Sequence, residues 1–143
     1  MVITIDGPSG AGKSTVSKRL ASELGFAYLD TGALYRAVAL AATVHGMDQE
    51  EEEAVIAAWL TRVDITAKPE NGRFVVYLDD SDVEPFIRNE EIGSVASRLS
   101  AMGPVREYLL GLQRKAGQAG DLVAEGRDMG TVVFPSAEVK FFL

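Results

Sequence analysis

Short apolar runs and helical patterns of apolar residues alternate along the first part of the chain. Residues 2–5 predict a short buried strand, and after a glycine-rich stretch Val16, Leu20 and Leu24 recur at every fourth position. Gly25 directly follows this helical pattern, where glycine is typical of a helix C-terminus. Residues 26–29 predict a second strand, and the apolar positions of 33–46 again follow helical order. This alternation of strands and helices predicts a parallel α/β sheet.

The apolar pattern changes in the middle of the chain. Residues 47–60 predict a helix that Asp48 caps and whose first turn carries the acidic run 50–53, a solvated helix start rather than an acidic binding patch. Residues 63–87 alternate with a period of two on either side of Asn71-Gly72, a strong hairpin signal, and 79–82 offer a second turn. The acids of that turn lack the glycine and the distal glutamate of a calcium-binding loop. We therefore expect a small antiparallel ribbon inserted into an α/β chain.

Helical patterns and strands resume toward the C-terminus. Two helices are predicted, over 89–101 and from Pro104 to about 116, and proline suits the first position of a helix. Residues 122–124 predict a third parallel strand that stops at Glu125, and 139–143 predict a fourth. We expect this fourth strand to form a sheet edge that carries Phe141, Phe142 and Leu143.

Composition narrows the class of protein. The 143 residues, of which 47% are hydrophobic, suit one globular domain. With 21 acidic against 14 basic residues and a net charge of −7, we expect neither nucleic acid nor an anionic membrane as a partner. The absence of cysteine excludes disulfides and thiolate metal sites. No apolar run is long enough to span a bilayer and no signal sequence opens the chain, so the cytoplasm is the expected location.

The glycine-rich stretch after the first strand fits the pattern G-x-x-x-x-G-K-[ST]. In this pattern the loop amides surround phosphates, the lysine reaches the outer phosphates and the hydroxyl binds Mg²⁺. A flexible glycine loop with an exposed lysine is the disfavoured alternative, and the glycine spacing does not fit a dinucleotide fingerprint. The residues expected to surround ATP phosphates are Gly7, Pro8, Ser9, Gly10, Ala11, Gly12, Lys13, Ser14 and Thr15.

Polar residues follow three of the predicted parallel strands. Ligands of such sheets bind beyond the carboxyl ends of the strands, so 6–7, 30–31 and 125–128 are expected to converge. Glu125 has the position of the second acid of P-loop enzymes, which holds Mg²⁺ directly or through water; a surface acid is the alternative. Arg36 and Arg127 could make forked contacts with a second phosphate.

Two further residues each have two possible roles. Tyr35 could belong to the core or touch a ligand. The single histidine, His45, stands at a helix end before Gly46, where capping or exposure to solvent is preferred over catalysis.

Four segments together resemble bacterial cytidylate kinases: "TIDGPSGAGKST", "YLDTGALYRAVAL", "PVRE" and "VAEGRDMGTVVFP". Members of this family transfer the γ-phosphate of ATP to CMP or dCMP in pyrimidine nucleotide metabolism. The resemblance implies an α/β fold, a P-loop NTPase-type parallel sheet with helices on both faces and a small antiparallel β insert in the monophosphate-binding region. It implies a single kinase domain over 1–143, with a core formed by 1–30 and 103–143 and a monophosphate-binding region over 31–102.

The resemblance also assigns roles to individual residues. It implies that Lys13, Arg36 and Arg127 are catalytic and that Mg²⁺ is held by Ser14 and Glu125. The CMP substrate would contact Thr31, Tyr35, Arg36, Ser97, Arg106, Arg127 and Asp128, with Ser97, Arg106 and Asp128 facing the cytosine. An aspartate that accepts from N4 and an arginine that donates to N3 suit cytosine, whereas uracil reverses the pattern at both positions.

The sequence departs from the family at its C-terminal end. Family members continue through an arginine-rich lid, a fifth strand and a closing helix, whereas this chain stops at "KFFL". A nucleotide-binding fragment with little or no turnover is therefore an alternative for the chain itself, and another P-loop kinase of a small metabolite is a second enzyme reading. ATP and CMP or dCMP are the expected partners, and a monomer is expected for the full-length protein.

Overall fold

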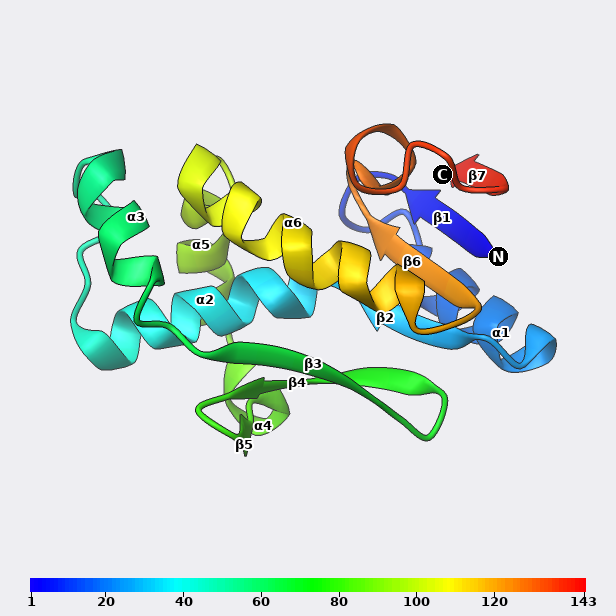
Figure 1. The fold of residues 1–143 in the computed structure, drawn as a ribbon, viewed down its shortest axis with the longest axis horizontal. Coiled ribbons are helices and arrows are strands. Elements are labelled where there is room, and N and C mark those ends of the chain that lie inside the picture. Colours follow the sequence, from blue (N-terminus) through cyan, green and yellow to red (C-terminus); the bar gives the residue numbers. More distant parts are fainter. The chain divides into compact units, whose positions relative to one another are not determined.

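The computed structural model describes all 143 residues, 1–143, and the chain divides into two compact units (Figure 1). The first unit comprises Met1–Thr31, Pro69–Phe74 and Gln113–Leu143. The second unit comprises Gly32–Lys68 and Val75–Leu112. Each unit therefore draws together segments that are far apart in the sequence.

A parallel sheet forms the centre of the first unit. Its strands are β1 (Val2–Asp6), β2 (Ala27–Asp30), β6 (Leu122–Gly126) and β7 (Val139–Phe142), in the order β2-β6-β1-β7. All three neighbouring pairs are parallel, so the predicted parallel α/β sheet is confirmed. β7 lies at the edge, as predicted, and Phe142 is 78% exposed there.

Helix α1 (Lys13–Leu24) covers one face of this sheet. Its Ala21 packs in a core cluster with Ile3 and Ile5 of β1, Tyr28 of β2 and Val123 of β6. The helix ends at a left-handed Gly25 whose amide donates to carbonyls of the last turn, so the predicted glycine cap is confirmed.

The opposite face of β1 carries a short π-helix, η1 (Met129–Val133). Side chains alternate along a strand, so Thr4 points away from the α1 face, and a Cβ added at Gly130 would lie only 2.8 Å from Thr4 Oγ1. Arg114 donates to the carbonyls of Val132 and Val133 and joins the end of α6 (Gly103–Gln118) to η1. Helical segments thus flank both faces of the sheet.

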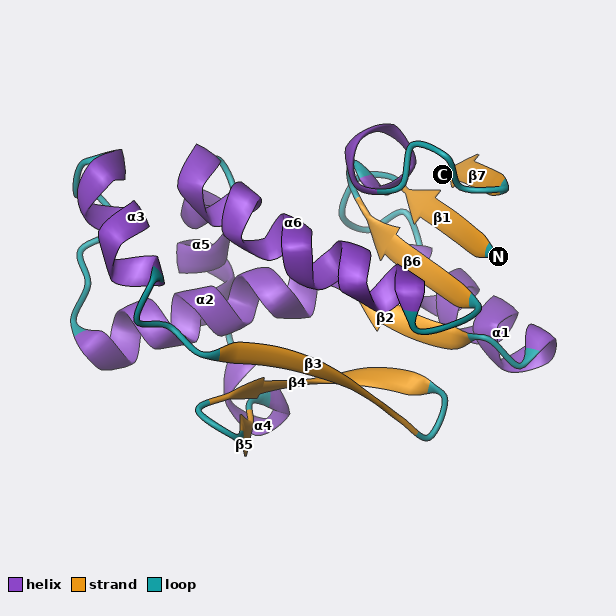
Figure 2. Cartoon of the chain, in the orientation of Figure 1, coloured by secondary structure: helices purple, strands orange, loops and turns teal.

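The second unit is mainly helical (Figure 2). It contains most of α2 (Thr31–His45), together with α3 (Glu53–Leu60), α4 (Glu84–Ile87), α5 (Glu90–Leu99) and the first part of α6. Its most deeply buried side chains come from several of these helices and include Leu34, Val38, Ile56, Ile87, Leu99 and Leu109. No helix of the chain is both long and apolar enough to cross a membrane.

The predicted antiparallel ribbon is present. Strands β3 (Ile65–Glu70) and β4 (Arg73–Leu78) are neighbours joined at Asn71 and Gly72, which both have positive φ as the predicted tight turn requires. A second turn at Asp79 and Asp80 leads into β5 (Ser81–Asp82), which pairs antiparallel with β4.

Three predicted boundaries are wrong. The helix expected over 47–60 begins only at Glu53, because Asp48 Oδ1 accepts from the amide of Glu50 at 2.9 Å and forms a turn instead of a cap. Residues 84–87, expected in the ribbon, form α4, whose first amide donates to Asp82 Oδ1. Strand β6 continues through Glu125 to Gly126 because it stays paired with β1 and β2.

Candidate functional site

The carboxyl ends of β1, β2 and β6 lie side by side in the first unit. β6 is the central strand of the three, and the register pairs Asp6 with Gly126 on one side and Asp30 with Glu125 on the other. The predicted convergence of these strand ends is therefore confirmed. In parallel α/β sheets such an edge is where ligands bind.

The loop between β1 and α1 presents backbone donors at this edge. Gly10 and Gly12 have φ of 80° and 85°, a left-handed conformation that glycine adopts without strain. Gly12 is the N-cap of α1 and provides no side-chain cap, so the amides of Lys13, Ser14 and Thr15 have no partner within the helix. Together with the helix dipole, these donors favour an anion.

The Lys13 side chain reaches back to this loop. Lys13 is half-buried, and its Nζ donates to the carbonyl of Pro8 at 3.0 Å. The segment from Pro8 to Gly12 is exposed. The amine is thus folded over the loop and can turn to a phosphate at the cost of one exposed hydrogen bond.

Glu125 is the buried acid of the site, with 3% of its surface exposed. Its Oε2 accepts from Ser14 Oγ at 3.1 Å, its Oε1 accepts from the Tyr28 hydroxyl, and its backbone carbonyl accepts from Thr31 Oγ1 at 2.7 Å. A buried carboxylate needs such donors because desolvation without them is costly. The alternative of a surface acid is wrong, since Glu125 lies within β6.

Burial raises the pKa of Tyr28 well above its usual range, and the nearby Asp30 and Glu125 carboxylates raise it further. The phenol therefore keeps its proton at neutral pH and acts as the donor to Glu125. Tyr28 was not among the predicted site residues, because an aromatic residue in an apolar strand is usually part of the core.

Thr31 begins α2 directly after β2 and is buried. Its hydroxyl is already used on Glu125, and a Cβ added at Gly126 would lie 2.6 Å from Thr31 Oγ1. The close approach of Thr31 to the end of β6 therefore requires glycine at position 126. In this structure Thr31 orders the strand ends rather than facing solvent.

Arg127 joins the end of β6 to the glycine-rich loop. Its Nη2 donates to Ser9 Oγ at 2.6 Å, and both side chains are exposed. A guanidinium at this place can exchange the serine for a phosphate oxygen. Asp128 follows it, half-buried, and its carbonyl accepts from the amides of Val132 and Val133 in η1.

Asp6 is a second buried acid at the strand ends. The sequence predicted it only as a polar residue that follows the first strand. Its carboxylate accepts from the amides of Met129 and Gly130 at 2.8 and 2.9 Å. These two bonds fix the segment that follows Arg127 and Asp128. The position of an acid at the end of a buried strand was the one signal in the sequence for this role. Its hydrogen-bond partners, Met129 and Gly130, are more than 120 positions away and could not be predicted.

The remaining predicted residues lie in the second unit. Tyr35 and Arg36 are half-buried on α2, whereas Ser97 on α5 and Arg106 on α6 are exposed. The structure brings the glycine-rich loop, Thr31, Glu125, Arg127 and Asp128 together within the first unit. The roles of Tyr35, Arg36, Ser97 and Arg106 stay predictions.

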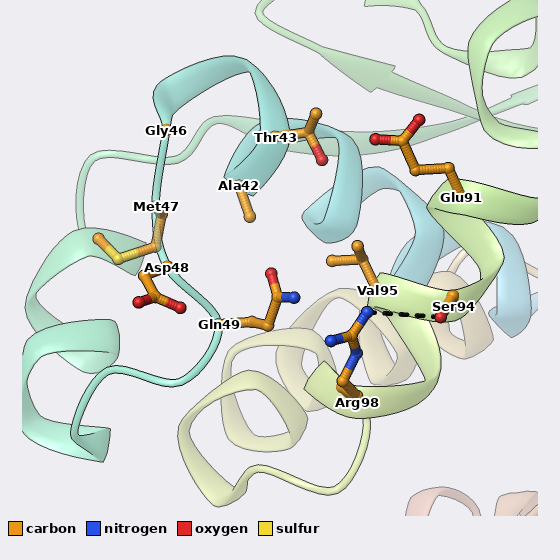
Figure 3. A pocket seen from close by; sticks show the side chains of 10 residues that line it. All are labelled: Ala42, Thr43, Gly46, Met47, Asp48, Gln49, Glu91, Ser94, Val95 and Arg98. Carbon is orange, nitrogen blue, oxygen red and sulfur yellow. Dashed lines mark hydrogen bonds between the residues drawn. The ribbon is translucent and has the colours of Figure 1, made fainter.

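Two pockets of the second unit contain none of these predicted residues. One, of about 520 Å³, is lined by Thr43, Glu91 and Arg98 among others, and Arg98 donates to Ser94 at 3.4 Å (Figure 3). The other, of about 490 Å³, contains His45, whose Nδ1 accepts from Trp59 Nε1 at 3.0 Å. His45 is exposed, in agreement with the prediction, but its contact with Trp59 was not foreseen.

The oxygen donors at the loop end suit Mg²⁺. Ser14 supplies a hydroxyl and Glu125 a carboxylate oxygen 3.1 Å from it. No group of three or more His, Cys, Asp or Glu residues in the chain could hold a metal ion. Mg²⁺ is commonly held by one or two carboxylates together with substrate phosphates and waters, so these donors fit an ion that arrives with phosphates.

Comparisons with known proteins agree on one family. A family model described as cytidylate kinase matches residues 3–143. A protein named cytidylate kinase from Syntrophotalea carbinolica is 50% identical over 143 residues, which are 100% of this chain and 60% of that protein. The cytidylate kinase of Vibrio parahaemolyticus is 51% identical over 142 residues, 99% of this chain and 62% of the relative. The chain thus spans about three-fifths of the length of these relatives.

Proposed function

The chain belongs to the cytidylate kinase family, and we propose that the complete protein transfers the γ-phosphate of ATP to CMP or dCMP. The bond between the γ-phosphorus and the β-phosphate oxygen breaks, and a bond from the γ-phosphorus to a CMP phosphate oxygen forms. The products are ADP and CDP or dCDP. Such transfer needs positioning and charge neutralisation more than covalent help from the protein.

The observation that carries this proposal is the arrangement of the glycine-rich loop and Glu125. A left-handed Gly12 opens α1, the amides of the first turn have no partner within the helix, and Ser14 Oγ lies 3.1 Å from Glu125 Oε2. A loop of this kind holds phosphates, while the paired hydroxyl and carboxylate hold their metal ion. Mg²⁺ bound with ATP would neutralise charge on the β- and γ-phosphates.

Within this proposal, residues of the loop hold ATP and others hold the acceptor. Lys13 neutralises the outer phosphates of ATP, and Arg127, which already reaches Ser9 on the loop, bridges toward the acceptor phosphate. The residues that would contact CMP are Thr31, Tyr35, Arg36, Ser97, Arg106, Arg127 and Asp128. Of these, Ser97, Arg106 and Asp128 would read the cytosine edge.

The observed state of Thr31 refines this assignment. Because its hydroxyl donates to the Glu125 carbonyl, we propose that it supports the acceptor site by fixing the strand ends. Its contact with CMP would require this bond to be shared or released.

The 143-residue chain itself has a second candidate function. It covers 60% of the length of the Syntrophotalea relative, so a nucleotide-binding fragment with little or no turnover is the alternative. We place the complete protein in the cytoplasm as a monomer, with ATP and CMP or dCMP as its partners and neither nucleic acid nor membrane among them.

Calorimetric titration followed by a kinase assay tests these proposals. CMP, UMP and AMP are titrated separately into the chain in the presence of ATP and Mg²⁺, and ADP release is then measured with a coupled assay. Preferential binding of CMP with CMP-dependent ADP release supports the kinase. Preferential binding without ADP release supports the nucleotide-binding fragment, and equal binding of all three contradicts the assignment to cytidylate.

A further inference from the structure

Tyr28 and Glu125 lie on neighbouring strands and face the same side of the sheet. The register pairs Tyr28 with Val123 and Asp30 with Glu125, so Glu125 lies two residues further toward the carboxyl end. Side chains two residues apart on a strand share a face, which places Glu125 on the side of Val123 and Tyr28. The Tyr28 hydroxyl donates to Glu125 Oε1 across this diagonal.

The ring of Tyr28 is held by the core of the first unit. Its exposure is 8%, and it clusters with Ile3, Ile5, Ala21 and Val123 beneath α1. Lys18 Nζ lies 5.9 Å from the ring centroid and covers the ring from the same helix. Packing therefore fixes where the ring lies, and its hydroxyl also interacts with the Ser14 side chain.

The second side-chain donor to Glu125 differs in this respect. Ser14 is exposed and stands in the first turn of α1, directly after the loop. Its hydroxyl donates to Oε2 at 3.1 Å and is the group expected to bind Mg²⁺. Of the two donors, only Tyr28 belongs to the packed core, so it sets the orientation of the carboxylate whenever Ser14 moves.

We propose that Tyr28 is a positioning residue for Glu125. Its hydroxyl anchors Oε1, which leaves Oε2 directed at Ser14 and at the ion that accompanies the phosphates. The inference rests on the proposed function, because the ion and the nucleotide belong to it. Residues that orient a metal-binding side chain change metal affinity about 10- to 100-fold when they are removed.

The test compares Tyr28→Phe with Tyr108→Phe in the 143-residue chain. Tyr108 also has a hydroxyl in two hydrogen bonds, with Val63 and Ile65 of the second unit, and is therefore a matched control. Mn²⁺ is titrated into the protein–ATP complex, with protein in excess over ATP, and free Mn²⁺ is followed by electron paramagnetic resonance. Affinity for ATP in EDTA is measured separately by calorimetry.

We expect Tyr28→Phe to bind Mn²⁺ about tenfold more weakly, at the lower end of the range for such positioning groups. Its affinity for ATP in EDTA should match that of the unmodified chain, and Tyr108→Phe should change neither value. Unchanged Mn²⁺ affinity in Tyr28→Phe would overturn the positioning role alone. An equal loss of ATP affinity in EDTA would also overturn it, because the hydroxyl would then support the loop rather than the carboxylate.

A double-mutant cycle distinguishes an effect of Tyr28 through Glu125 from a general loss of folding. If Tyr28 acts through Glu125, adding Tyr28→Phe to Glu125→Gln should weaken Mn²⁺ binding by less than twofold further. A full tenfold further loss would contradict action through Glu125. Failure of the unmodified chain to bind ATP with or without metal would overturn the proposed function and, with it, this inference.

Discussion

Asp6 accepts a hydrogen bond of 2.9 Å from the backbone amide of Gly130, a residue 124 positions later in the chain. The other carboxylate oxygen accepts from the adjacent amide of Met129. One acid at the end of β1 therefore fixes the start of η1, just beyond Arg127 and Asp128. The positions of two predicted substrate contacts thus depend on a residue that needs no contact with substrate.

Asp6→Asn should destabilise the chain because an amide offers only one acceptor for two buried donors. Hydrogen bonds to charged groups contribute about 1.5–3 kcal/mol, and we expect a loss of about 2 kcal/mol in the free energy of unfolding. Urea unfolding followed by circular dichroism measures it. Asp121→Asn is the control, since Asp121 pairs with the N-terminus at the exposed surface and should have a smaller effect. Equal effects of the two substitutions would contradict the role of Asp6.

Lys13→Ala should remove phosphate binding without weakening the fold. The amine makes one exposed hydrogen bond to the Pro8 carbonyl, so the melting temperature should barely change. In the complete protein, loss of one charge-stabilising donor should lower the rate by about 10²- to 10³-fold. Calorimetry with ATP, thermal melting and rate measurements check this.

Arg19→Ala provides the control for Lys13→Ala. Arg19 is a basic residue of the same helix, paired with Glu23 in an exposed ion pair. It should leave ATP affinity unchanged. A large drop in stability of Lys13→Ala with unchanged ATP affinity would show that the lysine is structural.

Asp128→Asn should weaken CMP binding more than ATP binding. A polar contact to a base edge contributes about 1–3 kcal/mol of discrimination, so the preference for CMP over UMP should fall about tenfold. Titrations of both monophosphates into both proteins measure the ratio. The same ratio in the two proteins would place Asp128 outside the base pocket.

Tyr28→Phe should flatten the dependence of stability on pH above about pH 10. The pKa of Tyr28 is raised in the folded state, mainly by burial, whereas the unfolded tyrosine titrates near 10. The unfolded state therefore binds fewer protons above pH 10, and the stability of the unmodified chain falls as the pH rises, by up to about 1.4 kcal/mol per pH unit for one group. Below that pH the contribution is fully present.

Urea unfolding at pH 8 to 11 measures this slope for both proteins. Burial also raises the pKa of Tyr108, so Tyr28→Phe should remove only part of the decline. Identical slopes in the two proteins would show that the Tyr28 phenol titrates as it does in the unfolded chain.

Local signals in the sequence predicted the order of elements well. The loop before α1, the glycine cap at Gly25 and the Asn71-Gly72 turn all depend on residues adjacent in the chain, and each lies where predicted. The start of α3 was wrong because Asp48 can cap a helix or close a turn, and both options use the same side-chain oxygen. The sequence alone does not choose between them.

Contacts between distant residues account for what was missed in the candidate site. The Tyr28 hydroxyl reaches Glu125, 97 positions away, and Asp6 holds amides more than 120 positions away. The hydrogen bond from Trp59 to His45 joins two different helices, α3 and α2. No periodicity encodes such pairs, because they follow from strand order and register rather than from neighbouring residues.

The exposed edge of β7 makes protein concentration a variable in every experiment on this chain. In the 143-residue chain β7 has β1 as its one neighbouring strand and carries the exposed rings of Phe141 and Phe142, and such an edge can pair with the same edge of a second molecule. Self-association stabilises the folded state by mass action, so apparent melting temperatures would rise with concentration. Comparisons between variants therefore need a common dilution, and a dilution series separates the intrinsic stability of the fold from that of its pairs.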